Sequence, residues 1–452
     1  MNSYLLNRSL GNISQHELRR YVLHRQLLAI QASEARFDGS QLQHASASSN
    51  GTSSLNDSPI AHHGGVNALV IDRFEGRYLL SGGADSTISI WDLEAATNDP
   101  EARTTLHTPL ATAPKGSTHK FGITDLTFYP FDSLAFLSSS FDHHLALSSA
   151  ETLRPSARFD LTSAIYAHAV SPIASHLLVA CATQHPSVRL VDLRAGAAAH
   201  ALAGHTGAVL AVAWSPRREH ILASGGVDGT ARLWDVRRAA AALAALDRED
   251  AVGVLGGAAA ARLSGAAHAG PCNGLAWSDD GEWLVTAGHD EKIRVWSMRD
   301  GRNSLASFGP LVRNRGLSRL RPCLVPQSIA GGGAETLFFP SEKEILQFEM
   351  FEGRMVKRLR VPGVSQVPVA PNAKVALKNK VLDLAWRAHS VELYSGHGDG
   401  TIKVWKPYLP EDKTANDELR EEEVEAENER KRKREALESV YQDLSRKKMI
   451  LS

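Results

Sequence analysis

The stretch Ser224-Gly-Gly-Val-Asp228-Gly-Thr-Ala-Arg-Leu-Trp234-Asp235 decides the fold, because its frame recurs along the sequence. A hydroxyl residue stands four positions before an aspartate, and a tryptophan stands six positions after it. In three of the four copies a histidine also lies 28 or 29 positions before the tryptophan. The copies are His63, Ser81, Asp85, Trp91; His205, Ser224, Asp228, Trp234; His268, Thr286, Asp290, Trp296; and Ser395, Asp399, Trp405. Such a fixed spacing indicates a repeat architecture.

Between these landmarks polar and apolar residues alternate, as in Thr230–Asp235 and Thr401–Lys406. A period of two predicts short β-strands, and Gly-rich dipeptides mark the bends between them. Each repeat therefore predicts a sheet of four short strands. Such a sheet cannot bury both of its faces alone and must stack on its neighbours.

Three further repeats keep the strand pattern but lose some of the landmarks. One runs from His119 through Ser138 and Asp142, with Ser148 where the tryptophan is expected, and the others cover residues 159–195 and 337–353. Four clear and three weak repeats over residues 62–407 make seven, close to the ~40–50 residues expected per blade. The pattern resembles that of WD-repeat propellers. The predicted fold class is all-β, a seven-bladed WD-repeat β-propeller with an N-terminal helical segment and a charged, partly helical C-terminal tail.

The resemblance to WD-repeat propellers also implies a role for the four landmark side chains. In that family they form a buried hydrogen-bonded relay, in which the histidine bonds the turn aspartate. The aspartate in turn orients the hydroxyl of the second strand and the indole N–H of the third. A buried carboxylate or indole without a partner costs about 1–3 kcal/mol. We therefore expect the relay aspartates to be structural and not catalytic.

The N-terminal residues predict a helix followed by a strand. Residues 12–25 are expected to be helical, because Ser14 and Glu17 fit a capping box and Ile13 and Leu18 are placed as its hydrophobic staple. Residues Gln26 to Ile30 are then expected to form an outer strand that closes the ring against the last blade.

The sequence predicts three parts, residues 1–25, 26–410 and 411–452, the middle one being the propeller. Residues 39–58 are a polar insertion of the kind that stays disordered. A second insertion, 248–267, is rich in alanine and glycine. A third, 361–380, replaces the Gly-His expected before the last blade, so the relay of that blade is predicted to be incomplete.

Composition excludes several classes of protein. Lys plus Arg and Asp plus Glu both number 50, which does not favour a uniformly basic nucleic-acid-binding surface. Three scattered cysteines, Cys181, Cys272 and Cys323, favour neither a disulfide framework nor a zinc site. No apolar run approaches the ~20 residues of a membrane helix, and no secretion signal is evident.

No motif of an enzyme, a nucleotide site or a metal site is found in the sequence. The adjacent histidines His62-His63 and His143-His144 are weak metal candidates, and His63 is already assigned to a relay. We expect no enzymatic activity, no cofactor and no metal. The basic run Arg430 to Arg434 fits a nuclear-import signal, so a nuclear location is expected.

Longer stretches resemble one group of WD-repeat proteins, the Cockayne syndrome protein A family. They are His62-His-Gly-Gly-Val-Asn-Ala-Leu with residues 75–85, Phe128-Tyr-Pro-Phe-Asp with Ser138-Ser-Ser-Phe-Asp142, Tyr166-Ala-His-Ala-Val-Ser-Pro172, and Leu210-Ala-Val-Ala-Trp-Ser-Pro-Arg217 with Leu233-Trp-Asp-Val-Arg-Arg-Ala239. The likeness extends to about Pro410, with the 39–58 insertion and the tail as departures, and we expect a fungal member of the family. The fourth repeat also resembles the box of cullin-4 substrate receptors, in which Trp-Asp-x-Arg helps dock the propeller.

This resemblance implies a substrate-recognition subunit of a cullin-4 ubiquitin ligase that acts in transcription-coupled nucleotide excision repair. The implied partners are the DNA-damage-binding adaptor of cullin-4 ligases, cullin-4 indirectly, a Swi2/Snf2-type repair ATPase and the RNA polymerase II complex. Neither direct lesion recognition nor a membrane is expected. The N-terminal segment and the fourth repeat carry the implied adaptor-binding residues, namely Leu5, Leu6, Arg8, Leu10, Asp235 and Arg237. Asp192-Leu-Arg194 in the third repeat is a weaker echo of that box.

Two other classes of function remain open. A scaffold in chromatin or RNA processing could share the propeller and lack the adaptor. A direct nucleic-acid-binding protein could use Arg430 to Arg434, and its binding would then be salt-sensitive. A solvated helix is the simpler interpretation of the charged tail, although Leu437, Val440, Tyr441 and Leu444 share one helical face.

Overall fold

The computed structural model describes residues 2–12, 14–39, 59–99, 104–173, 175–238, 242–248, 265–316, 318–325, 335–361 and 380–408. Contact clustering separates the chain into one compact unit, Met1–Lys406, and a second unit, Pro407–Ser452. Most of the three insertions and the charged tail after Pro410 lie outside the described residues, as does Ile13. The predictions for those segments therefore stay predictions.

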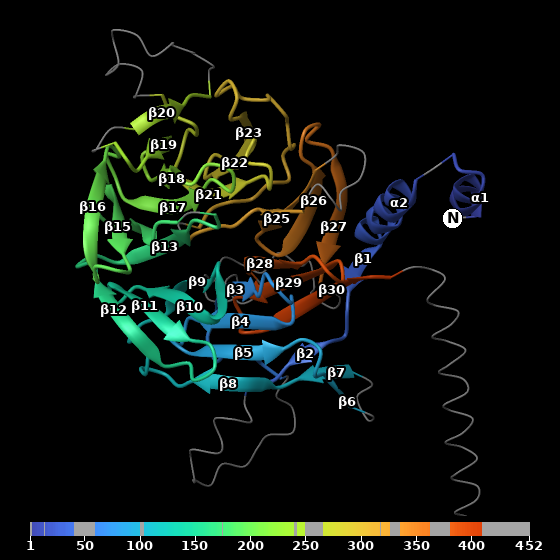
Figure 1. The fold of residues 1–452 in the computed structure, drawn as a ribbon, viewed down its shortest axis with the longest axis horizontal. Helices are drawn as coiled ribbons and strands as arrows, with labels where there is room; N and C mark the ends of the chain where they lie inside the picture. Colours follow the sequence, from blue (N-terminus) through green and yellow to red (C-terminus); the bar gives the residue numbers. More distant parts are fainter. Residues whose placement is uncertain are drawn as a thin grey trace, which may run out of the picture. The chain divides into compact units, whose positions relative to one another are not determined.

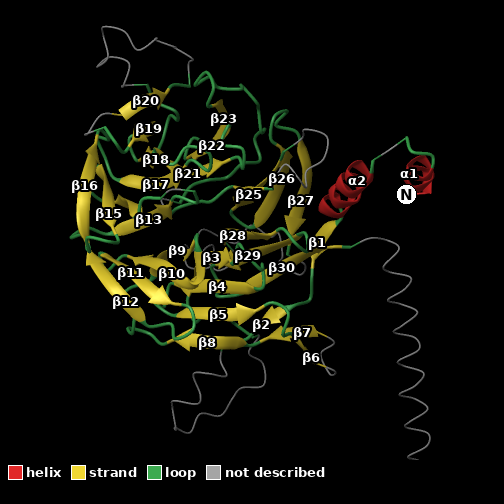
Figure 2. Cartoon of the chain, viewed as in Figure 1, coloured by secondary structure: helices red, strands yellow, loops and turns green. Residues whose placement is uncertain are grey.

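The first unit is a ring of seven antiparallel sheets, which confirms the predicted propeller (Figures 1 and 2). Blade 1 holds β3 (Val66–Ile71), β4 (Tyr78–Gly83), β5 (Ile88–Asp92) and β8 (Pro109–Ala113). Blade 2 holds β9 (Ile123–Tyr129), β10 (Asp132–Ser140), β11 (His144–Ser149) and β12 (Pro155–Asp160). Blade 3 holds β13 (Ile165–Val170), β14 (Leu178–Thr183), β15 (Ser187–Asp192) and β16 (Ala197–Ala203). Blade 4 holds β17 (Val209–Trp214), β18 (Ile221–Gly226), β19 (Ala231–Asp235) and β20 (Ala242–Leu246).

The remaining blades include the ones for which the sequence pattern was weakest. Blade 5 has three strands in the described part, β21 (Cys272–Trp277), β22 (Trp283–Gly288) and β23 (Ile293–Ser297). Blade 6 holds β24 (Cys323–Leu324), β25 (Thr336–Ser341), β26 (Glu344–Glu349) and β27 (Met355–Arg360). Blade 7 joins β28 (Val381–Arg387), β29 (Glu392–His397) and β30 (Ile402–Pro407) to β1 (Ile30–Ala32). A separate small sheet pairs β2 (Arg36–Phe37), β7 (Thr104–His107) and β6 (Thr97–Asp99).

The N-terminal strand closes the ring, but it starts later in the chain than predicted. Helix α1 covers Asn2–Ser9, and helix α2 covers Gln15–Leu28 with Ser14 and Glu17 forming the capping box. Of the strand predicted from Gln26 to Ile30, only Ile30 lies in β1, and the rest of the prediction is wrong because helix α2 extends to Leu28. Leu27, in the last turn of α2, is buried among residues of blades 6 and 7. Figure 1 shows α2 beside β27 and β1.

Apolar side chains fill the junctions between successive blades. The described residues form seven hydrophobic clusters, and each cluster combines side chains of two neighbouring blades. Trp91, Trp234, Trp296 and Trp405 are all fully buried in such junctions. The stacking of sheets therefore supplies the core that no single four-stranded sheet could make.

Candidate functional site

The relay of blade 4 holds four buried side chains in one hydrogen-bonded chain. The Trp234 indole N–H donates to Ser224 Oγ at 2.7 Å, and Ser224 Oγ lies 2.7 Å from His205 Nε2. The Nδ1 of His205 lies 3.1 Å from the Asp228 carboxylate. Because the Asp228 carboxylate can only accept, His205 Nδ1–H donates to it, which makes Nε2 of the neutral ring the acceptor of the Ser224 hydroxyl proton.

Electrostatics keep the relay aspartates ionised. Burial alone raises the pKa of Asp228, but hydrogen bonds from His205, the Thr206 amide and Thr230 outweigh it and hold the pKa far below its ordinary range. Blade 5 has the same hydrogen-bonded chain as blade 4, formed by His268, Thr286, Asp290 and Trp296. Each carboxylate also receives a backbone N–H from the loop that carries the histidine. The relays of blades 4 and 5 thus fasten their loops to the sheets through hydrogen bonds.

Glycine at the second position after the hydroxyl residue makes room for the relay. A Cβ built on Gly226 would lie 2.6 Å from His205 Nδ1 and 2.7 Å from Asp228 Oδ1. Gly83 and Gly288 face their relay histidines in the same way. In these three blades the second glycine of the pair therefore leaves the space that the relay histidine occupies, whereas blade 2 has Ser140 at this position.

In blade 1 the relay histidine is His62, and the assignment to His63 was wrong. His62 Nε2 lies 2.7 Å from Ser81 Oγ, and its Nδ1 lies 2.6 Å from Thr87 Oγ1. His63 contributes its backbone N–H, which donates to Asp85 at 2.9 Å. Sequence spacing does not distinguish the two candidates. His62–Ser81 and His205–Ser224 are 19 positions apart, but His63–Ser81 and His268–Thr286 are both 18 positions apart, and the spacing to tryptophan is equally ambiguous.

Blade 7 builds its relay from a histidine that the sequence analysis missed. His397 occupies the position that is glycine in the other repeats, and its Nε2 lies 3.0 Å from Ser395 Oγ. Trp405 donates its indole N–H to the same oxygen at 2.8 Å. His397 therefore takes the space left by the absent upstream histidine. The signal was present in the sequence as Ser395-Gly-His397, in the one copy without a histidine before the first strand.

Blade 2 keeps a partial relay without tryptophan. His119 Nε2 lies 2.8 Å from Ser138 Oγ, and its Nδ1 lies 3.1 Å from Asp142. Burial raises the pKa of Asp142, but the hydrogen bond from His119 and two backbone amides outweigh it and lower the pKa to about 2. The Ser148 hydroxyl, at the tryptophan position, is buried without a hydrogen-bond partner within the described residues.

The turn after β19 presents Arg237. The Asp235 carboxylate accepts the Arg237 backbone N–H at 3.1 Å, together with Nε at 3.0 Å and Nη2 at 2.8 Å. The hydrogen bond from Arg237 lowers the pKa of Asp235 to about 2. The Arg237 side chain remains 65% exposed. In blade 3 the Arg194 backbone N–H likewise donates to the Asp192 carboxylate at 2.8 Å, and Arg194 is also exposed.

The N-terminal residues proposed for docking lie on α1 and just after it. Leu6 and Leu10 are 62% and 64% exposed, and Arg8 is exposed. Leu5 lies on α1, but its side chain is outside the described part. These apolar side chains have no role in the propeller core, because the core clusters begin with Leu23 and Leu27 of α2.

Strand direction places Arg237 and the N-terminal helices at the same end of the blades. In an antiparallel sheet the loops after the first and third strands share one end, and we name this end the docking face. Arg237 follows β19, a third strand, whereas α2 leads directly into β1, the fourth strand of blade 7. Lys357, near the start of β27, donates to the Ile30 carbonyl at 2.6 Å and fixes this entry. The relay loops lie at the other end, which we name the relay face.

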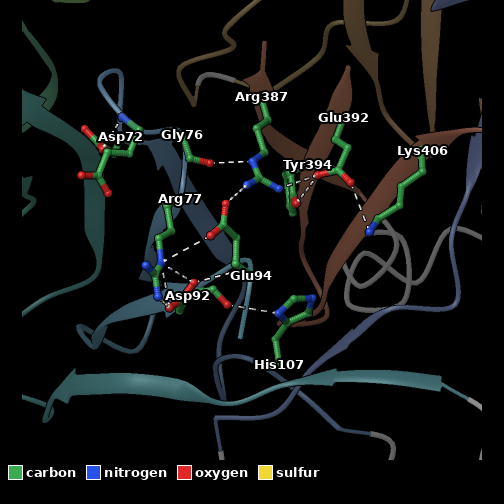
Figure 3. Close-up of polar contacts among 11 residues, drawn as sticks. Asp72, Gly76, Arg77, Asp92, Glu94, His107, Arg387, Glu392, Tyr394 and Lys406 are labelled. Carbon is green, nitrogen blue, oxygen red and sulfur yellow. Dashed lines mark hydrogen bonds and ion pairs between the residues drawn. The ribbon is translucent and has the colours of Figure 1, made fainter. Parts of the chain in front are cut away.

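A network of charges ties blade 7 to blade 1 on the docking face (Figure 3). Arg387 donates to the Gly76 carbonyl and lies 3.3 Å from Glu94 of blade 1 and 3.2 Å from Glu392 of its own blade. Asp92 occupies the place of Asp235 in the first repeat, and Arg77 pairs with it at 2.6 Å. Asp92 thus pairs with an arginine from the loop between β3 and β4 of its own blade, whereas Asp235 holds an arginine from its own turn.

Buried charges inside the ring escaped the sequence analysis. Asp125 of β9 is fully buried, and it pairs with Arg319 and, at 3.3 Å, with Arg321. Both arginines precede β24 of blade 6, so the ion pairs cross the ring from blade 6 to blade 2. The His168 amide donates to the same carboxylate at 3.1 Å. The repeat frame does not include these positions, which is why spacing could not identify them.

The described residues contain neither a membrane-spanning helix nor a metal-binding cluster. No helix there is long and apolar enough to span a bilayer. No cluster of three or more histidine, cysteine, aspartate or glutamate side chains in that part could bind a metal ion.

Comparisons with known proteins were made for the whole chain. The family model "WD domain, G-beta repeat" matches residues 54–92, 196–235, 262–297 and 375–406, the four copies with the full frame. The chain is 30% identical over 429 residues to WD repeat-containing protein ATCSA-1 of Arabidopsis thaliana, covering 80% of this chain and 90% of that protein. It is 31% identical over 198 residues to Ribosome biogenesis protein ytm1 of Neurospora crassa, covering 39% and 40%. It is 24% identical over 220 residues to WD repeat-containing protein slp1 of Schizosaccharomyces pombe, covering 48% and 36%.

Proposed function

Since this chain belongs to the WD-repeat protein family, we propose that it is the substrate-recognition subunit of a cullin-4 ubiquitin ligase. In this proposal the ligase acts in transcription-coupled nucleotide excision repair. The observation that carries the proposal is the exposed Arg237, held by Asp235 on the same face as the N-terminal helices. The nearly full-length similarity to ATCSA-1, whose name contains the letters CSA, supports it.

The geometry of Arg237 suits a docking residue. Asp235 takes Nε and Nη2, so the planar guanidinium is held in one orientation before any partner arrives. A fixed fork loses less conformational entropy on binding than a free arginine. In the described part Nη1 has no hydrogen bond, so it is available to a carbonyl or carboxylate of the DNA-damage-binding adaptor.

The N-terminal helices supply the apolar part of the proposed contact. Leu6 and Leu10 are 62% and 64% exposed, and Arg8 lies between them in the sequence. In the proposal this segment inserts into the adaptor as a helix in a groove. Cullin-4 is then held indirectly, and the relay face is free for the Swi2/Snf2-type repair ATPase and the RNA polymerase II complex.

Under this proposal the protein performs no chemistry itself. It presents substrates to the ligase that its adaptor holds, and it acts in the nucleus. Truncation tests this: a chain that lacks residues 1–24 keeps β1 and the closed ring, and it should lose cullin-4 and the adaptor in co-purification. Undiminished recovery of both partners with the truncated chain contradicts the proposal.

The second candidate is a scaffold in chromatin or RNA processing. The partial similarity to ytm1, a ribosome biogenesis protein, favours it. That match covers less than half of either chain, whereas the match to ATCSA-1 covers most of both. Affinity purification of the whole chain separates the two functions, because a scaffold brings down ribosome-assembly or chromatin proteins in the absence of cullin-4.

A further inference from the structure

The centre of the docking face is a preformed cavity with an apolar rim. The cavity has a volume of about 490 Å³, and the ends of the innermost strands of the blades line it. Phe74 lines the cavity in the loop after β3, and Phe131 and Ile173 directly follow the lining residues Pro130 and Pro172 in the loops after β9 and β13. Phe74 and Phe131 are 53% and 50% exposed, and Ile173 is also exposed. Exposed aromatic side chains beside a concave apolar site are typical of a binding surface.

The position of this mouth links it to the proposed adaptor contact. Arg237 belongs to blade 4, whereas α2 enters at blade 7. Blades 4 and 7 are three apart in a ring of seven, so they lie on opposite sides of the central axis. A partner that contacts both at once must pass over the centre of the docking face, where the mouth lies.

We infer that the adaptor covers this mouth with an apolar loop that packs on Phe74, Phe131 and Ile173 and enters the cavity. This inference rests on the proposed function and adds a third contact to Arg237 and the N-terminal helices. Aromatic anchors near the centre of an interface contribute most of the binding energy, because rim contacts exclude water from them. The central position makes these side chains stronger candidates than exposed apolar residues at the edge of the ring.

The residues that line the cavity indicate the chemistry of the adaptor loop that would enter it. Trp214 and Trp277 line the cavity and donate their indole N–H to the carbonyls of Ala169 and Ala213 of the preceding blades. Trp386 of blade 7 lines it too, but its buried indole nitrogen has no hydrogen-bond partner among the described residues. The Trp386 ring stacks on Phe338, and apolar residues such as Leu69, Val170 and Leu384 complete the wall. The fitting partner segment therefore carries one large apolar side chain.

A matched pair of double variants tests the inference. The full chain with Phe74→Asp and Phe131→Asp should bind purified adaptor at least about tenfold more weakly than the unmodified chain. The control is Phe121→Asp with Phe141→Asp, which alters two phenylalanines of similar exposure, 61% and 44%, on the relay face. The control should bind the adaptor within about twofold of the unmodified chain, since it lies at the other end of the blades. Melting temperatures verify that both variants fold.

Hydrogen exchange gives a second measurement that needs no variant. On adaptor binding, the loops 72–77 and 130–132 should gain protection, and the relay loops 119–122 and 141–143 should not. Unchanged affinity of the Phe74/Phe131 variant, with a clear loss for Arg237→Glu, overturns this inference and leaves the proposed function intact. Equal losses in both double variants also overturn it. Absence of any adaptor binding by the unmodified chain refutes both.

Discussion

At the scale of single residues, each relay is a set of buried polar groups that are all hydrogen-bonded. Its contribution to stability is measured by removing one member. Asp228 accepts hydrogen bonds from a histidine, a threonine and a backbone amide, and it is the member with most partners. Losing a buried acceptor leaves its donors unpaired, and that penalty exceeds the net gain of a hydrogen bond. Relay residues therefore report on stability, whereas exposed Arg237 reports on binding.

We predict that Asp228→Ala lowers the free energy of unfolding by about 1–3 kcal/mol, because its relay donors lose their acceptor. Arg237→Glu should leave stability nearly unchanged and weaken adaptor binding. Chemical denaturation and a binding assay on both variants test this. An equal loss of stability in both variants would show that Arg237 is structural.

Stability should depend even more strongly on the ion pairs inside the ring. Asp125→Ala leaves Arg319 and Arg321 with only Asp383 as a buried counterion, and removing one partner of a buried pair costs up to about 3–5 kcal/mol. Asp300→Ala, at an exposed turn, is the control and should stay within about 0.5 kcal/mol. Guanidinium unfolding of the two variants measures the difference, and similar midpoints contradict a clamping role for Asp125.

Stability should fall in mild acid because of buried histidines. Burial lowers the pKa of His168 to about 4, whereas an unfolded histidine has a pKa near 6.5. Burial lowers the pKa of His397 in the same direction. The unfolded chain binds more protons in this window, so the contribution is complete above about pH 6.5 and is lost as pH falls toward about 4.

Unfolding curves at pH 7.5, 6 and 5 should therefore give a declining free energy of unfolding. Burial also lowers the pKa of His107 and His268, so His397→Gln removes one of four such histidines in the described part and should make the decline shallower. A free energy that stays constant from pH 7.5 to 5 contradicts this prediction.

At the scale of elements, the N-terminal segment combines two roles that can be separated. None of the described side chains of helix α1 belongs to a core cluster, whereas Leu27 and Ile30 are buried among residues of blades 6 and 7. The strand β1 is the outer strand of blade 7, and Ser33 extends its pairing with a hydrogen bond to the Val404 carbonyl at 2.8 Å. The chain thus uses one continuous segment to close its ring and to carry the exposed leucines.

Two truncations distinguish these roles. Removal of residues 1–12 should leave the melting temperature unchanged, because none of those residues belongs to the core clusters. Removal of residues 1–33 deletes β1 as well, exposes an edge strand and should lower the melting temperature by several degrees. Thermal unfolding of both chains tests this, and an equally stable longer truncation shows that β1 does not close the ring.

At the scale of the whole molecule, the two faces of the ring divide the proposed work. The docking face holds Arg237, the entry of α2 and the cavity, and the relay face holds the loops fastened by the relays. With 50 basic and 50 acidic residues, the chain has no overall charge to draw it to nucleic acid. Recognition through other proteins is the simpler consequence.

We predict that the isolated protein has no preference for damaged over undamaged DNA. Any residual binding should weaken steeply between 50 and 200 mM salt, because phosphate contacts release counterions. Replacing Arg430–Arg434 with alanines is the control, since this basic run is the sequence's best candidate for such contacts. Lesion-specific retention that persists at high salt and without polymerase contradicts the proposed function.

The sequence by itself determined the number and order of the blades. The frame from Ser224 to Trp234 marked four of them, because a buried hydrogen-bonded chain needs its members at fixed spacing, and strand alternation marked the other three. Spacing also identified the helix cap at Ser14. Tertiary structure alone decided which histidine entered each relay, because His62 and His63 satisfy the spacing to Trp91 equally and only one imidazole fits above Gly83. It also decided the Asp125 ion pairs and the shared face of Arg237 and α2. These features depend on which blades meet across a closed ring. A local sequence pattern cannot predict a contact between residues almost 200 positions apart, such as Arg321 and Asp125.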